Sequence, residues 1–245
     1  AENGVITVEA DKPCKVSVYD ENTLIGQKTG ENTAFEIENV KLWSCETPNL
    51  YKIVLEYNGE VITDYVGVRK ISIDGRLFKL NGKPIKIKGV NRHSSNEKGY
   101  VETLEDIEKD LKIMREHNVN AIRTSHYQPH PYLTQLCDKY GIYLILECDI
   151  ETHGEVLTTC GNDNTKWDRL ANNENYKPLY LERARIMYER DKNRASVIMW
   201  SLGNESGFGC NHRAMSKYLR EQDNTRIIHY ERANSPQNKG VQDDC

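Results

Sequence analysis

The sequence lacks three features that would each point to a familiar class of protein. Among its 245 residues, 33 lysines and arginines stand against 37 aspartates and glutamates, a formal net charge of -4. Nucleic-acid-binding surfaces need a basic excess, so we expect no nucleic-acid partner. No apolar run approaches the roughly 18 residues of a membrane helix, so we expect no membrane association. The first residues have neither the basic start nor the apolar core of a signal peptide, and we expect a cytoplasmic protein.

Cysteine is present, but not in the spacings that bind metals or exchange disulfides. There are seven cysteines, and no two of them form a Cys-x-x-Cys pair. Thiolate metal sites and redox motifs are therefore poorly supported. We expect the thiols to be reduced, which agrees with the expected cytoplasmic location.

The first part of the chain, residues 1–68, has the pattern of an all-β domain. Short runs alternate between apolar and polar side chains, as strands with one buried face do; the runs are residues 5–8, 15–19, 34–37, 51–57 and 60–65. Turn-forming residues separate them, including residues 29–32 and the Asn58-Gly59 pair, which is a strong hairpin signal. The pattern predicts an immunoglobulin-like β-sandwich. A complete one needs about 100 residues, so we expect only part of it here.

From residue 69 to residue 245 the pattern changes to alternating strands and helices. After a small hairpin at residues 70–80, strands are predicted at residues 85–90, 121–124, 143–147, 197–202 and 227–230, and helices at 104–117, 131–140, 179–192 and 212–222. This alternation predicts an α/β domain with a parallel sheet, either doubly wound or a (β/α)8 TIM barrel. No glycine-rich nucleotide-binding motif follows the first strand, which disfavours the common doubly wound folds. We therefore expect a TIM barrel, cut off after about five of its eight strands.

The sharpest candidate for chemistry is Glu205, which follows an apolar strand in the run Trp200-Ser201-Leu202-Gly203-Asn204-Glu205-Ser206-Gly207. In a barrel the carboxyl ends of the strands meet at the face where catalysis takes place. A carboxyl desolvated at such a strand tip has a raised pKa and suits a general acid. The alternative is that Glu205 merely caps the next helix, where acidic residues are favoured in any case.

Two further clusters of polar side chains follow other predicted strands. Glu151 and His153 are two residues apart, so in extended backbone they point to the same side and could reach one ion. Two residues alone are a weak metal signal. His93, His126 and His130 also follow strands and, with Arg123, could form a polar pocket that binds sugar hydroxyls.

Four motifs follow one another along the chain: Gly89-Val90-Asn91-Arg92-His93, Arg123-Thr124-Ser125-His126-Tyr127, Ile150-Glu151-Thr152-His153-Gly154 and the run from Trp200 to Gly207. Taken in this order, they resemble the β-galactosidases of glycoside hydrolase family 2. Trp43 resembles a recurring motif near the end of that family's immunoglobulin-like domain. The resemblance implies that residues 1–68 are the latter part of this domain and residues 69–245 the N-terminal part of the catalytic barrel.

The resemblance also implies roles for individual residues. Glu205 matches the acid/base of a retaining double-displacement mechanism, and Glu151 and His153 match residues that, with Glu205, bind Mg²⁺. Residues implied to lie around the sugar or the nucleophile are Asn204, His93, His126 and Arg123. The family further implies a β-galactoside substrate, allows for Na⁺ in the complete enzyme, and predicts a homo-oligomer. Residues 94–98 and 128–131 depart from the family's pattern at the expected pocket rim, so they leave aglycone preference open.

No segment resembles the family's nucleophile motif, and Glu231 matches a Tyr-Glu pair of the family that is not the nucleophile. We therefore expect the chain by itself to be inactive. Three alternatives stay open. One is a non-catalytic carbohydrate-binding or assembly module. Another is a metal-dependent hydrolase that uses Glu151 and His153. The third is another family 2 activity, β-glucuronidase or β-mannosidase.

Overall fold

A computed structural model of the chain describes residues 3–160 and 166–233. The chain forms two compact units. The first comprises Ala1–Lys86, Gln135–Gly141 and Asn193–Ala195, and the second comprises Ile87–Thr134, Ile142–Lys192 and Ser196–Cys245. The expected pairing of an all-β part with an α/β part is confirmed.

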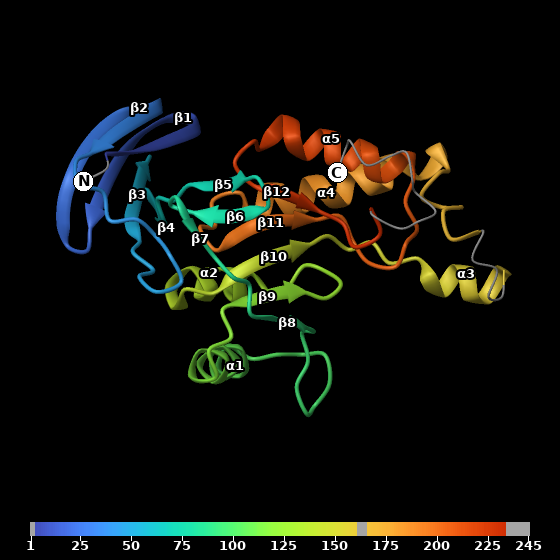
Figure 1. Ribbon diagram of the computed structural model, residues 1–245. Helices are drawn as coiled ribbons and strands as arrows, with labels where there is room; N and C mark the ends of the chain where they lie inside the picture. The colour runs from blue at the N-terminus through green and yellow to red at the C-terminus, as the bar shows by residue number, and fades with distance from the viewer. Residues whose placement is uncertain (1–2, 161–165, 234–245) are drawn as a thin grey trace. The chain divides into compact units, whose positions relative to one another are not determined.

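The first unit contains an antiparallel sheet of four strands in the order β2-β1-β3-β4 (Figure 1). The strands are β1 (Gly4–Asp20), β2 (Thr23–Ile37), β3 (Tyr51–Tyr57) and β4 (Glu60–Val66). Asn58 and Gly59 join β3 to β4 with φ angles of 46° and 84°, the left-handed backbone that the predicted hairpin turn requires. Buried side chains of β1, β2 and β3, among them Val16, Val18 and Phe35, form its core.

Two expectations for this sheet are wrong. The runs at residues 5–8 and 15–19 are parts of one long strand, β1, and the turn expected at residues 29–32 lies inside β2. The pairing of β1 with β2 explains both. Glu9 pairs with Asn32 and Cys14 with Gly30, so the extra residues of β1 are accommodated as an irregularity within the ladder.

The small hairpin is confirmed as the sheet β5 (Ile71–Asp74), β6 (Leu77–Leu80) and β7 (Lys83–Pro84). Ile85 adds to it, because its N–H donates to the carbonyl of Phe78 at 3.0 Å. Trp43 is fully buried in the same unit, and its Nε1 donates to the carbonyl of Asp138 at 2.8 Å.

The second unit contains a parallel sheet of five strands in the order β12-β11-β10-β9-β8. The strands are β8 (Gly89–Arg92), β9 (Ala121–Thr124), β10 (Tyr143–Glu147), β11 (Val197–Ser201) and β12 (Ile227–His229). Because each strand lies beside its predecessor in the chain, the sheet has no reversal of strand order, as a doubly wound sheet would have. This is the strand order of the first part of a TIM barrel. The strand predicted at residues 85–90 begins only at Gly89, since Ile85 belongs to the small sheet.

The helices are α1 (Leu104–Glu116), α2 (Pro131–Tyr140), α3 (His153–Cys160), α4 (Lys177–Asp191) and α5 (Cys210–Gln222), with a short 3-10 helix at Glu174–Tyr176. Thr103 and Asp106 form the capping box expected at the start of α1. The sequence did not predict α3. Because α5 begins at Cys210 with Gly209 as its N-cap, Glu205 does not cap it, and that alternative for Glu205 is wrong.

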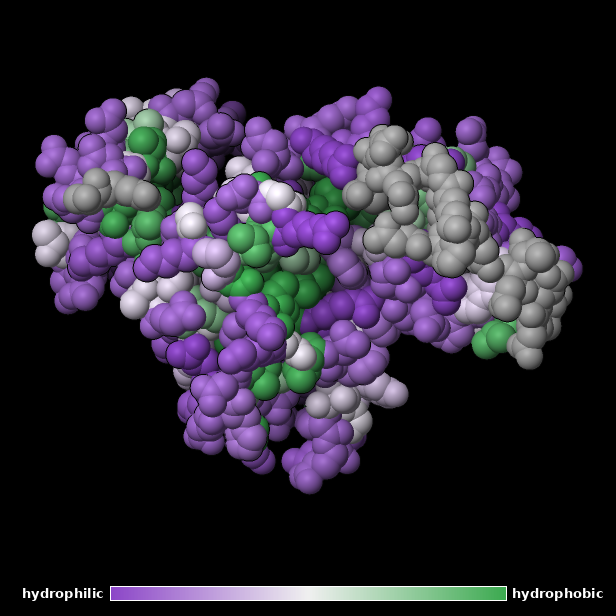
Figure 2. All heavy atoms as spheres, in the orientation of Figure 1, coloured by the Kyte–Doolittle hydropathy of each residue, from purple (hydrophilic) through white to green (hydrophobic). Residues whose placement is uncertain are grey.

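The surface is mostly polar. Figure 2 shows one face, largely hydrophilic, on which hydrophobic side chains reach the surface in places. Exposed apolar residues include Val61 and Ile62 on β4 and Val90 on β8. Within the described residues, we find no helix with the length and apolar character needed to cross a membrane.

Candidate active site

The turn that follows β11 places Glu205. Gly203 has a φ of 121° and Glu205 a φ of 37°, so the chain bends sharply on both sides of Asn204. A left-handed backbone is uncommon for glutamate and is often found at functional sites. The Glu205 side chain is 46% exposed, so the expectation that this carboxyl is desolvated is wrong.

Glu151, His153 and Glu205 lie close together, and each offers one ligand atom within 4.8 Å of the others. His153 Nδ1 lies 3.1 Å from Glu151 Oε1 and 3.4 Å from Glu205 Oε2. Even so, Nδ1 makes no hydrogen bond of acceptable geometry within the described residues. A ring nitrogen beside two carboxylates without hydrogen bonding to either fits a set of cation ligands. Carboxylate oxygens are the ligands that Mg²⁺ prefers.

Asn204 joins this cluster to the rest of the site. Its Nδ2 donates to Glu151 Oε1 at 2.9 Å, and its Oδ1 accepts from Arg123 Nη2 at 3.0 Å. Its backbone N–H donates to the carbonyl of Ile150 at 2.8 Å, which aligns the segment after β11 with the segment after β10. Asn204 is only 8% exposed, and these protein partners hold both ends of its amide.

Arg123 and His126, from the end of β9 and the segment after it, share a partner that the sequence did not single out. Both bond to Glu147, the last residue of β10, which is completely buried. Arg123 Nε lies 2.6 Å from Oε2, and His126 Nδ1 lies 2.6 Å from Oε1. The Ser201 hydroxyl donates to Oε2 at 2.7 Å.

Only two of the three predicted histidines lie together. The rings of His93 and His126 meet edge to face with centroids 5.6 Å apart. The ring of His130 instead stacks on Tyr132, with centroids 5.3 Å apart, and His130 makes no described contact with the other two. Of the neighbouring motif residues, Arg92 is buried in ion pairs with Glu102 and Asp110, which is a structural role.

Residues after β12 support the turn that carries Glu205. The Tyr230 hydroxyl donates to the carbonyl of Gly207 and accepts from the N–H of Ser206. Burial raises the pKa of Tyr230, which keeps this hydroxyl protonated. Glu231 Oε1 accepts from the Glu205 N–H at 3.1 Å. The Tyr-Glu pair was visible in the sequence, but only the fold shows which backbone it holds.

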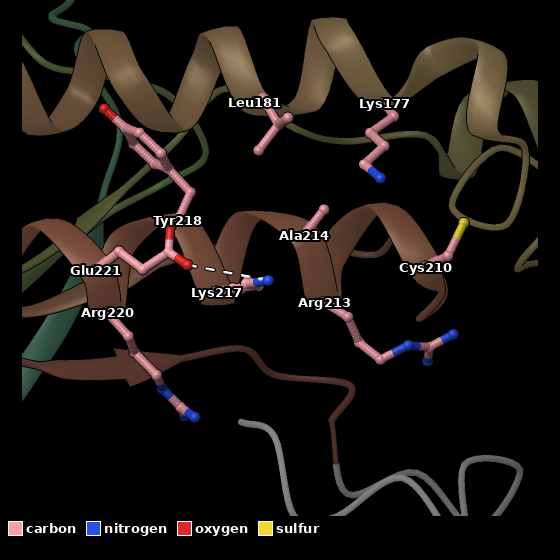
Figure 3. A pocket seen from close by; sticks show the side chains of 9 residues that line it. All are labelled: Lys177, Leu181, Cys210, Arg213, Ala214, Lys217, Tyr218, Arg220 and Glu221. Atoms are coloured by element: carbon pink, nitrogen blue, oxygen red, sulfur yellow. Dashed lines mark ion pairs between the residues drawn. The ribbon is translucent and has the colours of Figure 1, made fainter.

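A cavity of about 300 Å³ has walls that include two of the candidate site residues, His126 and Glu151, together with Tyr127 and Tyr180. A larger groove of about 730 Å³ lies elsewhere, between α4 and α5. Figure 3 shows its lining, in which Lys217 pairs with Glu221 on α5 at 4.0 Å. No strand-end residue lines that groove among the described residues, so the smaller cavity, which His126 and Glu151 line, is the one that belongs to the candidate site.

Known protein families match both parts of the chain. A family model described as "Glycosyl hydrolases family 2, TIM barrel domain" matches residues 71–244, and one described as "Glycosyl hydrolases family 2" matches residues 1–69. A β-galactosidase of Lactococcus lactis is 42% identical over 229 residues, covering 90% of this chain and 22% of that protein. A β-galactosidase of Streptococcus thermophilus is 44% identical over 205 residues, covering 80% of this chain and 20% of that protein.

Among solved structures, a β-glucuronidase of Ruminococcus gnavus superposes with a TM-score of 0.79 at 23% identity, covering 96% of this chain and 43% of that one. At that identity the likeness concerns the fold alone. The chain spans about a fifth of the length of the curated relatives it matches. The matched family models cover nearly the whole chain, and the chain belongs to glycosyl hydrolase family 2.

Proposed function

We propose that the chain is part of a retaining β-galactosidase in which Glu205 is the acid/base. The observation that carries the proposal is the junction at Asn204, which binds Arg123 on one side and Glu151 on the other and leads directly into Glu205. The β-galactosidases at 42% and 44% identity support the galactoside over other sugars.

In this mechanism Glu205 first protonates the glycosidic oxygen as the bond to the leaving group breaks. It then removes a proton from the water that releases the sugar. Its partial exposure agrees with a group that must reach both the leaving group and water. The nucleophile is a second carboxylate about 5–5.5 Å away. We assign that role to no carboxylate among the described residues.

Asn204 is the residue we expect at the sugar 2-hydroxyl, and His93 and His126 are those we expect at other hydroxyls. The pairing of Asn204 with Arg123 and Glu151 fixes the plane of its amide before a substrate arrives. A group that is already oriented loses little freedom on binding.

The residues that would hold Mg²⁺ are Glu151, His153 and Glu205. A magnesium ion bound there would supply a fixed positive charge beside the acid/base carboxylate.

The test uses a chimera, because the chain spans about a fifth of its relatives. This chain replaces the matching segment of the Lactococcus lactis β-galactosidase, and hydrolysis of nitrophenyl β-galactoside and nitrophenyl β-glucuronide is measured. We expect turnover of the galactoside, with Glu205→Gln lowering kcat by about 10²–10⁴-fold. The control, Glu221→Gln on the exposed face of α5, should leave kcat unchanged.

Other outcomes would replace the proposal. Turnover of the glucuronide alone would make the chain part of a β-glucuronidase. Sugar binding without turnover, unaffected by Glu205→Gln, would indicate a non-catalytic module. Loss of all activity with a chelator, restored only by a transition metal, would indicate a metal-dependent hydrolase.

A further inference from the structure

Glu147 is the most enclosed carboxylate near the site, and it receives three hydrogen bonds. It is completely buried at the end of β10. One oxygen accepts from Arg123 Nε at 2.6 Å and from the Ser201 hydroxyl at 2.7 Å, and the other lies 2.6 Å from His126 Nδ1. Burial of a charge is costly unless it is paired and hydrogen-bonded, and here the charge of Arg123 and the other two donors provide both.

These bonds determine where the hydrogens of two histidine rings lie. An ionised carboxylate only accepts hydrogen bonds, so His126 must carry a hydrogen on Nδ1 and Ser201 must donate its hydroxyl hydrogen. Ser201 Oγ lies 2.9 Å from His229 Nδ1 and has no second hydrogen to give. His229 therefore donates from Nδ1.

The remaining nitrogen of each neutral ring is a hydrogen-bond acceptor. Burial, aided by the nearby Arg123, lowers the pKa of His229 and favours its neutral form. In neutral His126 the hydrogen on Nδ1 leaves Nε2 bare. His126 and Glu151 line the same cavity of about 300 Å³, so Nε2 is the polar atom of this ring that remains for a ligand.

The same carboxylate holds the arginine that orients Asn204. Arg123 bonds Glu147 through Nε and Asn204 Oδ1 through Nη2, at 2.6 Å and 3.0 Å. Because Oδ1 accepts from Arg123, the amide nitrogen of Asn204 is directed to Glu151. Through its hydrogen bonds to His126 and Arg123, Glu147 thus affects both the cavity and the amide of Asn204.

We propose that Glu147 is a positioning residue. It fixes His126 as the Nδ1–H tautomer, so that Nε2 accepts a hydrogen from a ligand hydroxyl, and it holds Arg123 against Asn204. The identity of the ligand as a galactoside rests on the proposed function, whereas the tautomer does not.

The first experiment measures the tautomer directly, on the 245-residue chain labelled with ¹⁵N at histidine. Two-bond ¹H–¹⁵N spectra at about pH 8, where an ordinary histidine is neutral, distinguish a protonated Nδ1 from a protonated Nε2. We expect His126 to be protonated at Nδ1. Protonation of His126 at Nε2 in the unmodified chain would overturn the proposal, and this measurement needs no variant to fold.

Variants separate positioning from general support of the fold. Glu147→Gln introduces an amide that can donate, so we expect the Nε2–H form of His126 to appear. Asp191→Asn is the matched control, because Asp191 is another buried carboxylate of the same unit, bonded to Thr134. The control should leave the His126 signals unchanged. Ser201→Ala should alter His229 and leave His126 protonated at Nδ1. An unchanged His126 tautomer in a folded Glu147→Gln chain would contradict the proposal.

The second experiment uses the chimera with the Lactococcus lactis β-galactosidase and measures binding of a β-thiogalactoside, whose sulfur bridge is not hydrolysed, by titration calorimetry. Glu147→Gln should weaken binding by about tenfold, which corresponds to the loss of one oriented hydrogen bond, and Asp191→Asn should not. Equal affinities of the unmodified and Glu147→Gln chimeras would overturn the role toward the ligand. If the unmodified chimera binds no thiogalactoside, the proposed function fails, and the tautomer measurement alone decides the role of Glu147.

Discussion

At the scale of single residues, the cluster of Glu151, His153 and Glu205 is the feature most open to direct test. We predict that the chain binds Mg²⁺ and that Glu151→Gln weakens binding by about tenfold or more, because it removes a charged ligand. Titration calorimetry with MgCl₂ measures this.

Asp149→Asn provides the matched control for that titration. It removes the same charge two residues away, on an exposed side chain that lines the same cavity but is not part of the cluster. We expect it to change the affinity far less than Glu151→Gln. Equal weakening by both variants would mean that the cation responds to the general negative potential and that Glu151 is not a ligand.

His212 supports a prediction about stability and pH. It is fully buried, its ring stacks on Tyr230 with centroids 4.3 Å apart, and burial, with a smaller effect of Arg213, lowers its pKa to about 3 from 6.5. Below pH 6.5, His212 binds a proton in the unfolded chain but stays neutral in the folded chain. As the pH falls from 6.5 to about 3, this residue therefore lowers the free energy of unfolding by about 1.4 kcal/mol per pH unit.

We expect His212→Phe to remove this contribution, because neither ring nitrogen has a hydrogen-bond partner among the described residues. Urea unfolding at about pH 7 and about pH 5.5 should show a smaller loss of stability on acidification in the variant. His117→Gln, at the exposed end of α1, should behave like the unmodified chain. The same pH dependence in all three would show that His212 protonates freely in the folded state.

At the scale of elements, the segment between β11 and α5 depends on one close backbone contact. Gly203 has a φ of 121°, and a Cβ there would lie 2.5 Å from the Ile150 carbonyl oxygen and 2.7 Å from Ile150 Cβ. This contact brings Asn204 beside Glu151. We predict that Gly203→Ala weakens Mg²⁺ binding. We also predict that it lowers the free energy of unfolding by about 1–3 kcal/mol, the cost of the strained backbone.

Gly154→Ala tests that prediction with the same change of side chain. Gly154 lies in α3 next to His153, and a Cβ there would meet no atom within 4 Å. We expect no loss of Mg²⁺ affinity and no loss of stability, since alanine favours helix over glycine. If Gly203→Ala behaves like Gly154→Ala, the contact with Ile150 does not hold the site together.

The sequence predicted some elements much better than others, for physical reasons. The strands β9 and β10 were predicted to the residue, because most of their side chains are buried in the sheet. The strand β8 was predicted four residues too early, because residue 85 pairs with the small sheet and nothing local distinguishes the two partners. A strand's pattern shows which face it buries, whereas its partners depend on the rest of the fold.

The same distinction applies to the site. Glu205, Asn204, Glu151 and His153 follow apolar strands with polar neighbours, and the structure brings them together. Glu147 was not assigned a role, because a single charge at the end of an apolar strand does not show that donors from β9 and β11 will converge on it. The convergence is a property of the assembled sheet.

At the scale of the whole chain, the parallel sheet ends in two strands that pair on one side only among the described residues, β8 and β12. An unpaired strand edge presents backbone N–H and C=O groups that another chain can use. Val90 on β8 is 41% exposed, so this edge is apolar as well as unpaired. We predict that the 245-residue chain self-associates as its concentration rises, and that Val90→Lys shifts sedimentation toward the monomer.

Ile113→Lys on α1 tests whether the edge, and not apolar exposure in general, drives this association. Ile113 is 45% exposed, close to the exposure of Val90, but it lies on a helix whose backbone groups bond within the helix. A lysine there removes a similar apolar surface and leaves the strand edge as it was. If both lysine variants reduce association equally, exposed apolar area is responsible. If only Val90→Lys does so, the open edge of β8 is where the sheet accepts further strands, as the barrel order of its five strands requires.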